Sequence, residues 1–443
     1  MIYSKYNILS KIKDSDSHFI VNLLSGNADI LSKSEADLTL EFKNNGLNDS
    51  DFSTELQEKG YFSEPSTEKK NYQKAYFDFV DNRDSDEVQI FFVPNYSCNF
   101  ACTYCFQDEY SYPKNDLCAE VIDSFFAYVV KEFADRSKYI TIFGGEPLLV
   151  NPKQMQMVEY IITSAKNHGI DISVVTNGYY LEEYIEILKK GNIREVQVTL
   201  DGTEDFHNER RFLKDKSATF DKIVKGIDAA LSNQITINLR MVLDKMNMMN
   251  LPDLARFTIA KGWTKSEFFK TQIGRNYELH HCQSTSLQLY NRINLYEDLF
   301  ELIKANPEIV EFYKPAYSVA KFLSENGELP SPLFDSCPAC KTEWAFDYSG
   351  NIYSCTATVG KSDEVLGTFY PEITLKKDII EEWQSRDVTE IPECKECSLQ
   401  LACGGGCGSV AKNASGKICS TDCRPVKELL ELGFAAYFNN EIE

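Results

Sequence analysis

The sequence predicts an α/β protein in which an incomplete (β/α)6 barrel lies between a small N-terminal α+β module and a cysteine-rich C-terminal region. From Glu87 onward, strand-like apolar runs alternate with helix-length amphipathic stretches, which is typical of parallel βα units. Cysteines cluster after the first of these strands and again beyond residue 336. The length of 443 residues suits about three domains, and we expect them at residues 1–80, 86–325 and 333–443.

The first 80 residues differ in pattern from the rest of the chain. Phe19–Gly26 is typical of a strand entering a turn, and Phe52–Phe62 is typical of a short helix that ends at Gly60. The segment Ser63–Gln73 is polar, charged and contains a proline, so we expect a linker there.

The barrel prediction rests on six strand candidates, each followed by a helix candidate. In barrels of this kind the active site is built from loops at the carboxyl ends of the strands. The strands are expected at Val88–Val93, Tyr139–Phe143, Ile172–Val175, Glu195–Leu200, Ile235–Val242 and Glu267–Gln272. The helices are expected at Asp116–Asp135, Lys153–Asn167, Leu181–Lys190, Phe220–Leu231, Leu251–Lys261 and Leu287–Lys304.

The C-terminal region begins after Asn326–Asp335, a segment with two prolines. Phe346–Cys355 is typical of a β-hairpin with Ser-Gly-Asn at its turn, and Arg424–Tyr437 is typical of a helix. The run His280-His281-Cys282 places three possible ligands side by side, but adjacent residues rarely converge on one metal, so we interpret it as a solvent loop.

Composition excludes several classes of function. The formal charge of −21 disfavours a nucleic-acid partner, because such partners are bound by clustered Lys and Arg. There is no apolar run of about 18 residues and no secretory pattern at the N-terminus, so we expect a cytoplasmic protein without a membrane segment. In that compartment fourteen cysteines indicate metal ligation more than disulfides.

Cys98, Cys102 and Cys105 form a Cys-x3-Cys-x2-Cys loop directly after the first barrel strand. Closed electron-transfer clusters use four cysteines, so three thiolates leave one iron of a four-iron, four-sulfur cluster open to another ligand. A zinc site is the alternative, but zinc sites more often pair two separate hooks of ligands. The loop therefore predicts a cluster with a reactive iron.

This spacing resembles the signature of radical S-adenosylmethionine (SAM) enzymes, whose core is a partial TIM-like barrel. The resemblance implies that SAM binds the open iron and is reductively split into methionine and a 5'-deoxyadenosyl radical, which removes a hydrogen atom from the substrate. The second to fourth strand candidates end in segments similar to the SAM-binding segments of that family. The expected SAM contacts are Gly144, Gly145, Glu146, Pro147, Thr176, Asn177, Thr199, Asp201 and Arg211. Arg240 is a further candidate for the site, and His207 is expected to make an orienting hydrogen bond.

The C-terminal cysteines closely resemble the SPASM extension of radical SAM enzymes, which binds two auxiliary [4Fe-4S] clusters. The resemblance implies three clusters in all. The first auxiliary cluster would use Cys337, Cys340, Cys355 and Cys407. The second would use Cys394, Cys397, Cys403 and either Cys423 or Cys419, with Cys423 preferred because it directly precedes a helix-like stretch. Structural zinc is the alternative for Cys394, Cys397, Cys403 and Cys407.

Proteins with SPASM regions mostly modify peptides. We therefore expect a maturase that installs a thioether or related side-chain cross-link in a ribosomally synthesised peptide. The expected partners are a precursor peptide with a leader sequence and an external electron donor of flavodoxin or ferredoxin type. One interpretation of the N-terminal module is that it recognises the leader. The N-terminal module is equally explained as a cap on the barrel.

The alternatives are an anaerobic sulfatase maturase, which makes formylglycine, and a radical SAM peptide epimerase. Against the first, Thr356 follows Cys355 where the sulfatase-maturing relatives place an aspartate as proton acceptor. Against a non-catalytic metal scaffold, the open iron and the Gly144–Pro147 turn would have no role.

Overall fold

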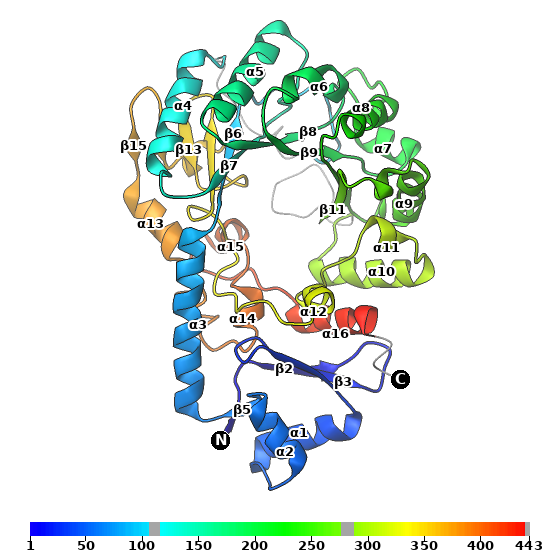
Figure 1. Cartoon of the computed structure of the whole chain (residues 1–443), viewed down its shortest axis with the longest axis vertical. Coiled ribbons are helices and arrows are strands. Elements are labelled where there is room, and N and C mark those ends of the chain that lie inside the picture. Colours follow the sequence, from blue (N-terminus) through cyan, green and yellow to red (C-terminus); the bar gives the residue numbers. More distant parts are fainter. Residues whose placement is uncertain (106–115, 276–287, 439–443) are drawn as a thin grey trace.

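The computed structural model describes residues 1–105, 116–275 and 288–438. The run His280-His281-Cys282 lies outside these residues. Three parts follow one another along the chain, and Figure 1 shows an incomplete barrel at one end and a small α+β module, which holds the N-terminus, at the other.

The N-terminal module is an antiparallel sheet with two helices. Strands β2, β3 and β4 form the sheet in that order, and β1 pairs with β5 beside it. The bounds are β1 Ile2–Tyr3, β2 Asn7–Lys11, β3 His18–Asn22, β4 Asn27–Leu31, α1 Lys33–Asn45, α2 Asp51–Glu58 and β5 Phe62–Ser63.

The linker predicted at Ser63–Gln73 is wrong. Helix α3 (Pro65–Ser85) begins there, with Pro65 in its first turn, where the missing N–H costs no hydrogen bond. None of its residues is fully buried, but Tyr72, Tyr76 and Phe79 recur at helical spacing and pack against Phe334 of the C-terminal region. The helix also runs past residue 80, so the module boundary there remains a proposal.

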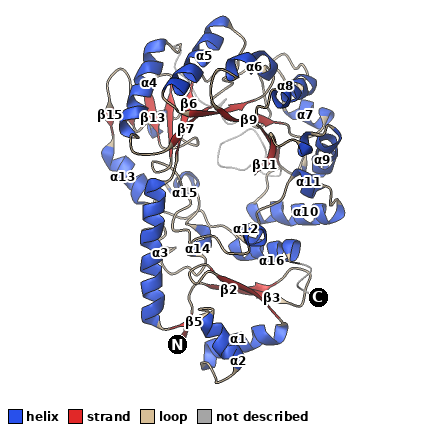
Figure 2. Ribbon diagram, viewed as in Figure 1, coloured by secondary structure: helices blue, strands red, loops and turns tan. Residues whose placement is uncertain are grey.

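The barrel prediction is confirmed. Strands β6 to β11 pair in parallel and in chain order, and the helices cover their outer face, as Figure 2 shows. The strands are β6 Val88–Val93, β7 Lys138–Ile142, β8 Asp171–Thr176, β9 Ile193–Thr199, β10 Ile237–Leu243 and β11 Phe269–Arg275. The helices are α4 Ala119–Glu132, α5 Pro152–Asn167, α6 Leu181–Leu188, α7 Glu204–Arg210, α8 Phe220–Ser232, α9 Leu251–Ala260 and α10 Arg292–Ala305.

The C-terminal region continues the same sheet. Strand β12 (Glu343–Asp347) pairs in parallel with β6 and forms the predicted hairpin with β13 (Asn351–Tyr353). Strands β14 (Gly367–Thr368) and β15 (Thr374–Leu375) extend the sheet to ten strands. The remaining helices are α11 Ile309–Phe312, α12 Ala320–Asn326, α13 Lys377–Ser385, α14 Gln400–Cys403, α15 Gly408–Ser415 and α16 Val426–Tyr437.

Two apolar cores hold these parts together. The larger one fills the space between the barrel strands and their helices, with Phe92 and Phe125 at its centre. The second joins the N-terminal sheet to α16, where the rings of Phe19 and Phe434 stack with centroids 4.6 Å apart. No helix in the described residues combines the length and the apolar character needed to cross a membrane.

Candidate active site

The three cysteines of the first motif lie in the loop that leaves β6, and all three are partly exposed. Burial and then the Glu146 carboxylate raise the pKa of the Cys98 thiol to about 12, and the sulfurs of Cys102 and Cys105 act on it in the same direction. The Phe100 amide donates to Cys98 Sγ at 3.4 Å. The structure therefore brings the three thiols together around one loop.

The Gly144–Pro147 turn packs directly on the segment that precedes Cys98. The Gly145 and Glu146 amides donate to the Asn95 and Ser97 carbonyls at 3.2 and 2.8 Å. A Cβ on Gly145 would lie 2.3 Å from the Tyr96 oxygen, so only glycine fits. This close approach fixes the start of the cysteine loop.

Glu146 is held by several hydrogen bonds within the protein. Its carboxylate is 1% exposed and already accepts hydrogen bonds from the Thr176 hydroxyl, the Asn177 amide and the Leu148 amide. This carboxylate thus joins the ends of β7 and β8. Burial raises the pKa of Glu146, and these donors oppose that shift.

Asp201 is also enclosed. It is fully buried, and its two oxygens contact Arg210 Nε at 3.2 Å and the Val242 amide at 3.0 Å. Burial alone would raise the pKa of Asp201, but the Arg210 and Arg211 cations outweigh it and lower the pKa. Arg210 also binds Asp244 at 2.8 Å, so this network ties β9 to β10.

Arg211 lies beside the cysteine loop. Its Nη1 donates to the Tyr104 hydroxyl at 2.7 Å, and Tyr104 stands between Cys102 and Cys105. Arg211 Nε is buried without a partner among the described residues, as are Asn99 Nδ2 and Asn95 Oδ1. A guanidinium N–H, an amide donor and an amide oxygen beside three thiols fit the carboxylate and polar groups of SAM. Asn177 holds Asn99 in place through a 2.8 Å hydrogen bond.

The first predicted set of C-terminal thiols lies where β12, β13 and α15 meet. Burial, followed by Glu343, raises the pKa of Cys355 to about 12. Burial likewise raises the pKa of Cys337 and of Cys340. Cys355 and Cys337 contribute to the raised pKa of Cys340. Cys407 acts on Cys337, so the four predicted ligands are neighbours.

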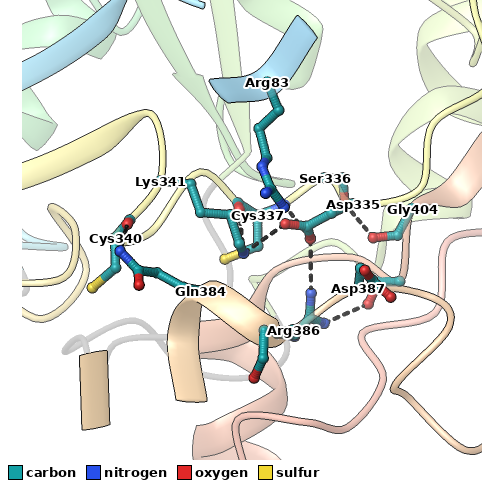
Figure 3. Close-up of polar contacts among 12 residues, drawn as sticks. Arg83, Asp335, Ser336, Cys337, Cys340, Lys341, Gln384, Arg386, Asp387 and Gly404 are labelled. Carbon is teal, nitrogen blue, oxygen red and sulfur yellow. Dashed lines mark hydrogen bonds and ion pairs between the residues drawn. The ribbon is translucent and has the colours of Figure 1, made fainter. Parts of the chain in front are cut away.

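A buried ionic network supports this set (Figure 3). Asp335 accepts from the Cys337 amide at 3.0 Å and forms ion pairs with Lys341 at 2.6 Å and Arg386 at 3.3 Å. Arg386 is fully buried and donates to the carbonyls of Gly405, Gly406, Ile418 and Ser420. One guanidinium thus holds the loops on either side of Cys407.

Cys423 and Cys419, the two candidates for the last ligand of the second predicted set, have different neighbours. Burial raises the pKa of Cys394 to about 11, and Cys403, Cys397 and Cys423 are the next causes. The groups that act on Cys419 in the described structure are charged side chains, Glu382 first, and none of them is a cysteine. This arrangement favours Cys423.

In the described part of the chain, no three His, Cys, Asp or Glu side chains converge in the geometry of a single metal ion. A four-iron cluster spreads its thiolates over four irons, so they stand farther apart than around one zinc ion.

A cavity of about 820 Å³ fills the barrel and connects the two cysteine regions. Tyr104, Thr199 and Arg211 line it on the side of the first motif. Cys337, Cys355 and Cys407 line it on the C-terminal side, together with Glu343 and Thr356. Neither Asp201 nor the Gly144–Pro147 turn reaches this cavity wall. The position of Tyr104 within the cysteine motif could have singled it out, whereas no motif in the sequence points to Glu343.

The sequence comparisons agree with this geometry. Residues 92–258 match the Radical SAM superfamily. The GTP 3',8-cyclase of Campylobacter jejuni subsp. doylei is 30% identical over 167 residues, which is 37% of this chain and 50% of that protein. The Rhizobium etli enzyme of the same name is 32% identical over 168 residues, or 37% and 46%. The chain thus spans about half the length of these curated relatives.

Two solved structures share the fold. The structure described as "Native anSMEcpe with bound AdoMet and Cp18Cys peptide" has 19% identity and a TM-score of 0.61, and covers 80% of this chain and 99% of its own. Streptococcus suis SuiB bound to S-adenosylmethionine has 16% identity and a TM-score of 0.51. The match covers 96% of this chain and 99% of the SuiB chain. At these identities the likeness concerns the fold. Residues 92–258, which include the cysteine loop, thus match the radical SAM domain, and the chain shares its fold with these two solved structures.

Proposed function

We propose that the protein is a radical SAM peptide maturase that forms a thioether, or a related side-chain cross-link, in a ribosomally synthesised peptide. The observation that carries this proposal is the cavity that Tyr104 of the first cysteine loop lines on one side and three predicted auxiliary-cluster thiols, Cys337, Cys355 and Cys407, line on another. A residue held between these walls would lie within reach of both. The volume suits a short peptide segment, since ligand cavities commonly span about 300–1,000 Å³.

The residues have distinct roles in this proposal. Cys98, Cys102 and Cys105 would hold a [4Fe-4S] cluster, and Arg211 would bind the SAM carboxylate through its free Nε. When bound, the cluster and SAM would supply the radical that removes a hydrogen atom from the substrate. The barrel wall encloses the substrate, and the side of the cavity lined by Cys337, Cys355 and Cys407 would position the substrate sulfur.

The abstracted hydrogen would leave on 5'-deoxyadenosine, and closing the carbon–sulfur bond on the resulting carbon radical would release the thiol proton and one electron. Two auxiliary clusters at the C-terminal cysteines are the proposed acceptors of that electron, and an external donor of flavodoxin or ferredoxin type would supply the reducing electron for the first step. The proposed partner is a precursor peptide with a leader sequence. Its support is the peptide in the anSMEcpe complex and the precursor peptide SuiA in a SuiB complex.

The N-terminal module is the proposed leader-binding element. Its sheet order leaves β4 (Asn27–Leu31) at an edge, where an extended peptide can add a strand through main-chain hydrogen bonds.

The test is the mass change of a precursor peptide after anaerobic reaction with SAM and a reductant. Loss of two hydrogens with a blocked thiol is the expected result. An unchanged mass with deuterium gained in heavy water would indicate epimerisation instead. Cys98→Ala is the control, and SAM cleavage by that variant would contradict the whole proposal.

Formylglycine formation remains the second candidate because of one contact. Glu343 Oε1 accepts hydrogen bonds from the Thr356 amide and hydroxyl at 2.8 and 3.2 Å. A carboxylate thus lies beside the position where sulfatase-maturing relatives have an aspartate, and it faces the same cavity. Conversion of a sulfatase-derived peptide to an aldehyde would place this function first.

A further inference from the structure

Arg240 projects into the barrel cavity from the middle of its wall. Strand β10 alternates buried and partly exposed residues, and the partly exposed positions include Arg240. Its register partners are Thr199 on β9 and Gln272 on β11, and both also line the cavity. Arg240 therefore lies in the middle of β10, level with Thr199, a predicted SAM contact at the end of β9.

The guanidinium has a fixed position on the cavity wall. It lies over Gly274 of β11, where a Cβ would come within 2.7 Å of Nη2 and 2.8 Å of Nε. A larger residue at 274 would displace it. The glycine thus leaves room for a flat guanidinium, and a group held in this way loses little side-chain freedom when it binds a ligand.

The neighbouring cations of the cavity are already engaged. Arg194 pairs with Glu87 at 2.7 Å, and Lys270 pairs with Glu195. Arg211 donates to Tyr104 on the cysteine loop. By contrast, Arg240 Nε is buried and has no hydrogen-bond partner in the described part of the chain, and no ion pair of Arg240 is found there. An unpaired guanidinium in a partly dry cavity is favourable only when a ligand supplies the counter-charge.

We propose that Arg240 binds a carboxylate of the peptide substrate, so that the enzyme selects peptides with an Asp or Glu close to the modified residue. This inference rests on the proposed peptide maturase function. A carboxylate matches the fork of N–H donors of a guanidinium, and the pair is a strong, directional contact. The free Nε, the fixed position over Gly274 and the location between the two cysteine regions all suit a group that orients substrate.

SAM also carries a carboxylate, and the geometry assigns that group to the other arginine. Arg211 is joined to the cysteine loop through Tyr104, and its own Nε is free there. Arg240 instead lies against β11. Each guanidinium has an Nε without a partner in the described residues, and the two lie at different places along one cavity, so together they can bind two carboxylates.

The experiment compares Arg240→Gln and Arg240→Glu with the wild type on a precursor peptide and on versions with each Asp or Glu changed to Gln or Lys. Arg194→Gln is the matched control, because it removes a cavity arginine whose charge is already paired. Iron content and SAM affinity, measured by equilibrium dialysis on the reconstituted enzyme, show that each variant folds.

The expected result is that Arg240→Gln lowers kcat/KM for the acidic peptide about tenfold to a hundredfold, with SAM affinity unchanged. For one peptide in which an acidic residue is replaced by Gln, kcat/KM of the wild type should fall by the same factor, and Arg240→Gln should lower it no further. A lysine at that peptide position should restore turnover by the Arg240→Glu variant. If Arg240→Gln lost SAM affinity by the same factor as kcat/KM, Arg240 would be assigned to SAM. If the wild type turned over all peptide versions equally, there would be no acidic preference. Either result overturns the inference. A wild type that modifies no peptide would instead refute the proposed function itself.

Discussion

The Tyr96 hydroxyl donates a 2.9 Å hydrogen bond to Asp347 Oδ2, and both residues are buried. Tyr96 lies two residues before Cys98, whereas Asp347 ends β12 and begins the hairpin that leads to Cys355. Tyr353 donates to the same oxygen at 2.8 Å. One carboxylate therefore joins the loop of the first cysteine motif to the hairpin of the C-terminal region.

Tyr96→Phe should destabilise the protein by about 1.5–3 kcal/mol, because it removes a donor from a buried carboxylate. Urea denaturation under anaerobic conditions measures the change. Tyr160→Phe is the control, since its hydroxyl contacts the exposed Asp123 and its loss should cost about 0.5 kcal/mol or less. Equal stability of the Tyr96 variant and the wild type would mean that this contact does not hold the two regions together.

Gly145→Ala should weaken SAM binding about tenfold or more. The new Cβ would meet the Tyr96 and Ser97 carbonyl oxygens at 2.3 and 2.4 Å, and backbone can yield only by moving the start of the cysteine loop. Equilibrium dialysis of the reconstituted enzyme gives the affinity. Gly169→Ala, where the added Cβ meets open space, should bind SAM normally. Normal binding by the Gly145 variant would show that the turn does not position the site.

Cys423→Ala should lower the iron content by about four atoms per chain, and Cys419→Ala should leave it unchanged. The reason is that Cys423 is among the charges that act on Cys394, whereas those that act on Cys419 in the described structure are not cysteines. Iron and sulfide analysis after anaerobic reconstitution measures the outcome. The reverse pattern would assign Cys419 as the ligand.

Because of His207, the free energy of unfolding should be lower in mild acid than at neutral pH. Burial, and then the Arg211 charge, lower the pKa of this histidine to about 3, against an ordinary 6.5. Its contribution is complete above pH 6.5 and is lost as the pH falls toward 3, because only the unfolded chain takes up the proton in that range. The loss between pH 7 and pH 5 is about 2 kcal/mol.

Denaturation of His207→Gln at both pH values checks this prediction. The variant should lose the corresponding part of the pH dependence, although it is less stable overall because the bonds to the Asp201 amide and Thr219 change. The same slope in variant and wild type would exclude His207 as its source.

The sequence predicts the barrel well because its strands and helices carry local hydrophobic patterns. All six strands and their helices lie close to the expected positions, and the hairpin before Cys355 is confirmed. Helix α3 was missed because the proline and the charged residues at its start were interpreted as a linker, although Tyr72, Tyr76 and Phe79 recur at helical spacing. These side chains pack against Phe334, a contact far along the chain that the local pattern does not show.

The site was predicted less completely than the fold. A motif identifies residue types, but it does not show which polar groups are already paired. Glu146 accepts a hydrogen bond from Thr176 and Asp201 accepts one from Arg210, so both carboxylates already have partners within the protein. The roles of Tyr104, Glu343 and Arg240 depend on long-range contacts that spacing in the sequence does not encode.

The pairing of β12 with β6 also bears on how the chain is made. Gln89 lies opposite Glu343, so one edge of the barrel stays open during synthesis until the last quarter of the chain emerges. An open parallel edge exposes unpaired N–H and C=O groups and invites pairing with other chains. A shortened chain that ends before β12 would keep every residue of the first cysteine motif and still tend to aggregate. Expression of the barrel without its C-terminal region is therefore a poor route to a working core.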